Sequence, residues 1–104
     1  MVDKVMILPI PTFTRIRQAD NNADTLMLYM FYRYTMAEQM TREIICTTTK
    51  AGKMLGWTIE RVSKAKQQLE ELGLIEEGTD RYSDGRIARH TINLIVIPFD
   101  DYSD

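Results

Sequence analysis

Two short helices separated by a tight turn are the feature of this sequence that most constrains its fold. The first helix would begin after Thr48 or Thr49, since either side chain could accept a backbone N–H at a helix N-terminus. Its apolar side recurs at i, i+3 and i+4 in Ala51, Met54 and Leu55. This spacing predicts one short amphipathic helix.

The second helix would follow almost at once. Gly56 stands where a left-handed C-terminal cap favours a residue without a β-carbon, and Thr58 can cap the next N-terminus. The following helix would end at Gly73. Its buried side is predicted to be the stripe Val62, Ala65, Leu69 and Leu72.

A β-hairpin is predicted after these helices. Leu74 and Ile75 open its first strand, residues 82–85 (Tyr-Ser-Asp-Gly) supply a turn, and residues 86–97 return as the second strand. The chain therefore predicts the order helix, turn, helix, hairpin.

This order, with its residues, resembles the winged helix-turn-helix superfamily. The matching positions are a small residue in the first of the two helices, a glycine before the turn, Thr and Val entering the second helix, and an L-x-x-L-G-L-I ending, here Gly52, Gly56, Thr58, Val62 and residues 69–75. Where the family usually has alanine, Gly52 would allow a very close helix crossing, at a cost of roughly 1 kcal/mol in helix propensity. The resemblance implies an α+β fold: a three-helix core, a small antiparallel sheet and a β-hairpin wing.

One domain is expected over residues 1–98, because the chain of 104 residues has room for a single core. Residues 1–18 are expected to be extended, with a helix at 23–34 and a strand at 43–47 before the helix-turn-helix. The remaining divisions are the helix-turn-helix at 47–73, the wing at 74–97 and an acidic tail at 99–104.

The chain is most similar to the N-terminal DNA-binding domains of phage and plasmid replication initiators, in which a Leu-Tyr pair, here Leu28 and Tyr29, precedes a Cys-Thr stretch, here Cys46 and Thr47. The resemblance implies double-stranded DNA binding in replication initiation, and a longer protein of which this is the front. A dimeric transcriptional regulator is an alternative within DNA binding. A winged helix that serves protein–protein interaction or assembly is the alternative from another class.

Charge is segregated along the chain although the net charge is only −2. Residues 47–68 contain five lysines and arginines against Glu60 alone, a local charge of +4, whereas residues 69–84 contain six acidic residues against Arg81, a local charge of −5. Because phosphate neutralisation dominates nucleic-acid affinity, the first stretch is the expected DNA-facing surface.

The second helix is expected in the major groove. The residues expected to face base edges are Ile59, Glu60, Ser63, Lys64 and Gln67. The residues expected to face phosphates are Thr49, Lys50, Lys53, Thr58, Arg61, Lys66, Arg81, Arg86 and Arg89.

Three alternatives stay open for these residues. Glu60 could accept a hydrogen bond from a cytosine amino group or simply favour the helix N-terminus. Trp57 could close the helix pair or stack on a nucleotide. The lysines could be ordinary solvated side chains.

The helix before the motif is apolar on both sides. One side carries Leu26, Met27, Met30, Phe31 and Tyr34, and the other is a candidate homodimer face formed by Leu28, Tyr29, Tyr32 and Met36. Cover by the N-terminal residues 5–10 and Phe13 is the competing explanation.

No residue pattern indicates catalysis, a cofactor or a metal. Cys46 is the only cysteine and is expected to be a buried core residue, while His90 has no neighbouring ligand to complete a metal site. The apolar run at residues 5–10 is interrupted by Pro9, so neither a signal peptide nor a membrane span is expected. We therefore expect a cytoplasmic protein that is not an enzyme.

Overall fold

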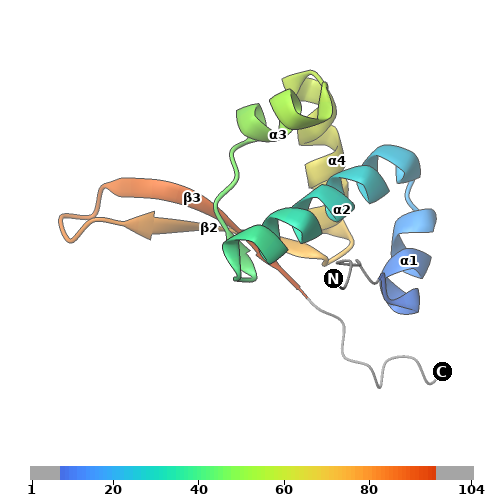
Figure 1. Ribbon diagram of the computed structural model, residues 1–104, viewed down its shortest axis with the longest axis horizontal. Helices are drawn as coiled ribbons and strands as arrows, with labels where there is room; N and C mark the ends of the chain where they lie inside the picture. The colour runs from blue at the N-terminus through green and yellow to red at the C-terminus, as the bar shows by residue number, and fades with distance from the viewer. Residues whose placement is uncertain (1–7, 96–104) are drawn as a thin grey trace, which may run out of the picture.

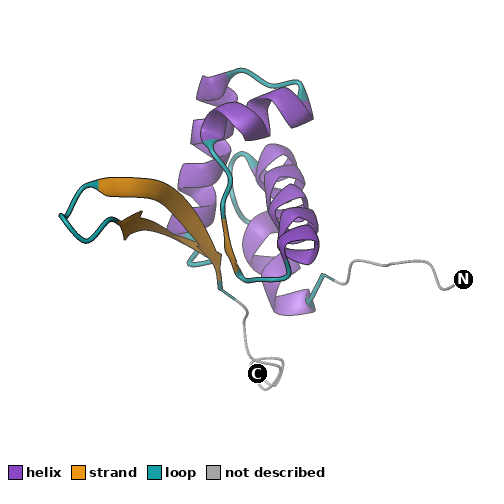
Figure 2. Ribbon diagram, turned by 60° about the vertical axis from the view of Figure 1, so that its left-hand side comes forward, coloured by secondary structure: helices purple, strands orange, loops and turns teal. Residues whose placement is uncertain are grey.

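The structure is a computed structural model that describes residues 8–95. Within them the chain forms four helices and one three-stranded antiparallel sheet, so the predicted α+β class is confirmed (Figure 1). The helices gather to one side, and a long hairpin projects away from them (Figure 2). The elements are α1 Ile10–Arg17, α2 Asn22–Gln39, β1 Glu43–Ile44, α3 Thr48–Leu55, α4 Ile59–Glu71, β2 Ile75–Arg81 and β3 Ile87–Leu94.

Helix α1 corrects the expectation of an extended segment over residues 1–18. Pro9 is its N-cap and Pro11 lies in its first turn, where a missing N–H costs nothing because the first helical N–H groups have no intrahelical acceptor. Thr12 and Ile16, one helical turn apart, are buried against the rest of the protein. The prolines therefore start a helix here. Residues 1–7 lie outside the described part.

Helix α2 is longer than predicted. The side that was the candidate homodimer face is turned into the core and not toward solvent. Leu28, Tyr29 and Tyr32 are at most 1% exposed and Met36 is half-buried, so the candidate homodimer face is the core of the chain itself. Hydrophobicity could not decide between the two sides because both are apolar. The other side remains exposed, with Met27 at 53% and Tyr34 at 47%.

Helices α3 and α4 form the predicted pair. Gly56 ends α3 with a φ of 71°, and the Thr58 hydroxyl accepts a hydrogen bond from the Arg61 N–H at 3.2 Å. At the start of α3 the cap is Thr47, which accepts from the Lys50 N–H at 3.0 Å, rather than Thr48 or Thr49. The two predicted caps were thus one and two residues too late within a run of three threonines.

Side chains from α4 and the sheet complete the core around α2. The predicted stripe of Val62, Ala65 and Leu69 is fully buried, and Leu72 is half-buried. Cys46 is 4% exposed, as predicted, although it follows β1 instead of lying in a strand. Burial raises the pKa of its thiol, against the opposite effect of Lys50 and Lys66.

The sheet has the order β1-β3-β2, and its outer part is only two strands wide. β1 pairs with β3 at Ile92 and Asn93, while β2 pairs with β3 along its whole length, from Ile75 opposite Leu94 to Arg81 opposite Ile87. All residues from 81 to 90 are exposed. The predicted hairpin is therefore present and projects beyond the core. The predicted acidic tail at 99–104 and residues 96–98 lie outside the described part.

Across residues 8–95, none of the helices has both the length and the apolar content needed to cross a membrane.

Candidate nucleic-acid interface

The outer face of α4 carries every residue that the sequence predicted to face bases. Val62, Ala65 and Leu69 fix the rotation of the helix by entering the core, so the opposite side points to solvent. The exposed set is Ile59, Glu60, Ser63, Lys64 and Gln67.

Charge changes sign along this face. The first half of α4 carries Glu60, Arg61 and Lys64, a net charge of +1, whereas the second half carries Lys66, Glu70 and Glu71, a net charge of −1. The Glu71 carboxylate accepts hydrogen bonds from the side-chain amides of Gln67 at 3.3 Å and Gln68 at 3.5 Å. A polyanion would therefore meet the N-terminal half of α4 most favourably.

Three lysines stand out because they are exposed and form no ion pair among the described residues. Lys50 and Lys53 belong to α3, and Lys64 belongs to α4. Thr49 is also exposed, beside the N-terminus of α3. The backbone N–H groups at such an N-terminus favour an anion in addition to the lysine charges.

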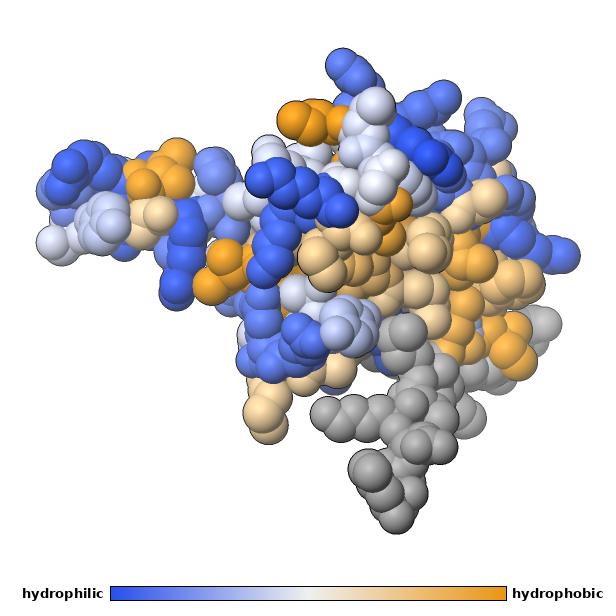
Figure 3. All heavy atoms as spheres, turned by 45° about the horizontal axis from the view of Figure 1, so that its top comes forward, coloured by the Kyte–Doolittle hydropathy of each residue, from blue (hydrophilic) through white to orange (hydrophobic). Residues whose placement is uncertain are grey.

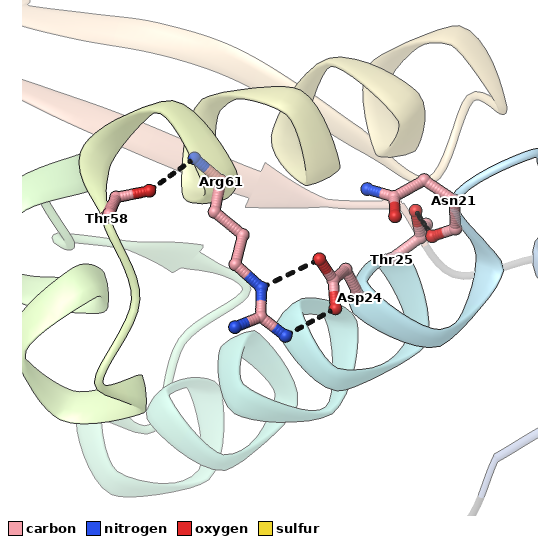
Figure 4. A network of polar contacts seen from close by, with 5 residues as sticks. All are labelled: Asn21, Asp24, Thr25, Thr58 and Arg61. Carbon is pink, nitrogen blue, oxygen red and sulfur yellow. Dashed lines mark hydrogen bonds and ion pairs between the residues drawn. The ribbon is translucent and has the colours of Figure 1, made fainter.

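Arg61 is committed to contacts inside the protein. Its Nε and Nη2 atoms both donate to the Asp24 carboxylate of α2 at 2.9 Å (Figure 4). Its guanidinium also lies 4.3 Å from the centre of the Trp57 ring. The hydrogen bond from Arg61 lowers the pKa of Asp24. These contacts tie the start of α4 to α2, and they involve Trp57, which is partly buried against the core.

Lys66 is also engaged. Its ammonium group forms an ion pair with Glu77 of β2, and its side chain is only 17% exposed. Nearby, burial and the charge of Glu77 raise the pKa of Glu70, while Lys66 acts in the opposite direction. Lys66 therefore connects α4 to the base of the hairpin.

Each arginine of the hairpin contacts a carboxylate or a carbonyl oxygen of the hairpin itself. Arg86 pairs with Asp84, and Arg89 pairs with Asp80, each at 2.6 Å. Arg81 donates to the Gly85 carbonyl at 2.8 Å. All of these contacts are exposed, and ion pairs in such positions are weak enough to exchange for a phosphate.

A cleft of about 300 Å³ lies between the start of α3, α4 and the hairpin. Cys46, Lys66, Glu77 and His90 are among its lining residues. Within residues 8–95, no group of three or more histidine, cysteine or acidic side chains is arranged to hold a metal ion.

Sequence reasoning missed three residues of this region. Asp24 gave no local signal because it lies 37 positions from Arg61. Thr47 was hidden in a run of threonines, each with the chemistry of a cap. Tyr82 was noted only for its turn, yet it is 58% exposed and its ring lies 5.6 Å from the Arg86 guanidinium.

Comparison of the chain with protein-family models, with curated proteins and with solved structures finds no match in any of the three.

Proposed function

We propose that this protein binds double-stranded DNA as a winged helix, with α4 in the major groove and the β2–β3 hairpin as the wing. The observation that carries the proposal is the outer face of α4. It is exposed and mostly polar, its first half carries a net charge of +1, and α3, which packs against α4, carries Lys50 and Lys53, which form no ion pair among the described residues. The resemblance of residues 48–75 to winged helices supports the same conclusion.

The residues divide by their contacts into those that read bases and those that hold phosphates. Lys64 is suited to guanine O6 and N7 and Gln67 to adenine N6 and N7, with Ile59, Glu60 and Ser63 beside them. Lys50 and Lys53 hold phosphates together with the N-terminus of α3. In this scheme Arg61 and Lys66 position α4.

The wing supplies a second contact with the backbone. In its outer part, residues 80–89, the three arginines Arg81, Arg86 and Arg89 outnumber Asp80 and Asp84 by one charge. β1 supports the sheet only at Ile92 and Asn93, and all residues from 81 to 90 are exposed, so the outer hairpin is accessible to DNA.

A titration of a fluorescently labelled duplex at two salt concentrations tests the proposal. The variant Lys50→Glu/Lys64→Glu reverses two unpaired lysines on the proposed face, and Arg17→Glu/Arg42→Glu is the control because it changes the net charge by the same amount on α1 and before β1. We expect salt-sensitive binding by wild type and the control, and none by the first variant. Equal loss in both variants, or no binding by folded wild type, would overturn the proposal.

Single substitutions then separate the two kinds of contact. Lys53→Ala should weaken binding to every duplex and reduce the salt slope by about one, because one phosphate contact is lost. Gln67→Ala should instead change the sequence preference. Equal weakening on all sequences would remove Gln67 from the base-reading set.

Replication initiation of the phage or plasmid type is the setting that we propose for this DNA binding, on the resemblance at Leu28-Tyr29 and Cys46-Thr47. A dimeric transcriptional regulator is the alternative. The context of the bound sites distinguishes them, because an initiator binds within a replication origin and a regulator binds at promoters.

Protein–protein interaction is a second candidate, favoured by a separate surface. Ile10 and Phe13 of α1 are 65% and 46% exposed, and Met27 and Tyr34 of α2 are similarly accessible. This surface is distinct from the face of α4, so the two functions are compatible in one molecule.

A further inference from the structure

The exposed side of α2 has the spacing of a coiled-coil seam. Ala23, Met27, Met30, Tyr34 and Ala37 follow one another at intervals of four, three, four and three residues. All five are uncharged; Met30 is half-buried and the other four are exposed. In a water-soluble helix such a stripe at a and d positions is the surface that a second helix covers. We call these five residues the α2 seam.

The residues that border the seam indicate what the second helix is. In a parallel pair, each g position faces the e position five residues further along the partner. By this rule Arg33 of one helix meets Glu38 of an identical helix, and Leu26 meets Phe31. In an antiparallel pair g positions face g positions, so Arg33 would face Leu26 or Arg33 of the partner and not Glu38. The α2 seam is thus complementary in charge to a parallel copy of itself.

Both charged residues are held at the edge of the seam. Arg33 donates to the Tyr29 hydroxyl at 3.3 Å and lies over the same ring. Glu38 lies one helical turn after Tyr34, a seam residue, and its proximity raises the pKa of Tyr34. Arg33 and Glu38 therefore border the apolar stripe.

We propose that two copies of this chain associate through their α2 seams, arranged in parallel about a two-fold axis, with reciprocal Arg33–Glu38 pairs. Apolar residues gather on this surface over α2 and toward α1 in Figure 3, and Ile10 and Phe13 of α1 enlarge the patch. The interface is isologous, since each copy contributes the same residues.

This association does not depend on DNA binding. α4 packs against the other side of α2, where Leu28, Tyr29 and Tyr32 form the core, so the outer face of α4 stays free in the dimer. The test is therefore made without DNA, and its failure leaves the proposed function untouched.

Sedimentation velocity over a range of protein concentrations measures the association. Met27→Glu places a charge in the seam, and Met54→Glu is the matched control because Met54 is 62% exposed on α3. We expect Met27→Glu to raise the dimer dissociation constant at least about tenfold and Met54→Glu to leave it unchanged. Circular dichroism establishes that each variant is folded.

Charge reversal tests the parallel arrangement. Arg33→Glu and Glu38→Arg should each weaken the dimer, and the double variant should restore it because the pair is re-formed with exchanged signs. A wild-type monomer at every concentration would overturn the proposal. Equal weakening by Met27→Glu and Met54→Glu, or a double variant weaker than both single ones, would also overturn it.

Discussion

The Arg61 guanidinium is held on two sides, by the Asp24 carboxylate and by the face of Trp57. The sequence placed Arg61 among the phosphate contacts because it lies near the N-terminus of a predicted DNA-facing helix. A partner 37 residues away is not visible in local patterns. Arg61 therefore orients α4, whereas Lys50, Lys53 and Lys64 form no ion pair among the described residues.

The Asp24–Arg61 pair predicts a specific acid dependence of stability. Arg61 lowers the pKa of Asp24 below its ordinary value of 3.8, so the pair stabilises the fold fully above that value. The stabilisation is lost as the pH falls through the lowered pKa. Asp24→Asn should therefore be less stable than wild type near neutral pH, and the difference in unfolding free energy should vanish at the acid end.

Urea unfolding at several pH values measures this difference. Asp20→Asn is the control, because it removes an exposed carboxylate from the loop before α2 without touching Arg61. If Asp24→Asn lowered the free energy of unfolding by the same amount at every pH, the electrostatic explanation would be contradicted.

Gly52 predicts an unusual response to alanine. A β-carbon at this position would lie 2.9 Å from the Trp57 carbonyl oxygen, which is backbone, and 3.7 Å from Val62 Cγ2. Gly52→Ala gains roughly 1 kcal/mol of helix propensity, but overpacking at a tight crossing costs about 1–3 kcal/mol. We therefore expect no gain in stability and a net loss of about 1 kcal/mol.

Thermal unfolding of Gly52→Ala and Thr49→Ala compares two alanines in the same helix. Thr49 is exposed, so its variant reports propensity alone. A Gly52→Ala protein that melts above wild type would show that the close approach to Trp57 is not required.

The turn between α3 and α4 illustrates what short-range patterns determine. Gly56 and Thr58 were assigned correctly because each acts through its own backbone or its nearest neighbours. The Thr58 cap should contribute about 1 kcal/mol, so Thr58→Ala should lower the free energy of unfolding by that amount. Thr58→Ser keeps the hydroxyl and should remain close to wild type. Equal destabilisation in both variants would remove the cap from the explanation.

Helices α1 and α2 illustrate what such patterns leave open. Pro9 and Pro11 would interrupt a strand or the middle of a helix, which favoured an extended segment. Proline is equally suited to the first turn of a helix, and this is where the two prolines lie. On α2, both sides are apolar, so which one is buried depends on α4 and the sheet. The core residues Leu28 and Tyr29 were therefore mistaken for a dimer face. The apolar character of α2 was predictable, but the side that enters the core was not.

At the scale of the whole molecule, the apolar and the cationic surfaces occupy different places. α2 lies between them, burying one side against α4 and exposing the α2 seam on the other. Glu70 and Glu71 of α4 and Glu76 and Glu77 of β2 lie at or beyond the C-terminal end of α4, so the proposed phosphate contacts fall on α3, the first half of α4 and the outer hairpin.

Mapping the bound duplex on the protein by nuclear magnetic resonance tests this account most directly. With ¹⁵N-labelled protein, addition of duplex DNA should shift the backbone amides around Lys50, Lys53 and Lys64 and along the β2–β3 hairpin, and should leave those of Met27 and Tyr34 unchanged. Shifts concentrated on the α2 seam, or none at all in a folded protein, would contradict DNA binding through α4.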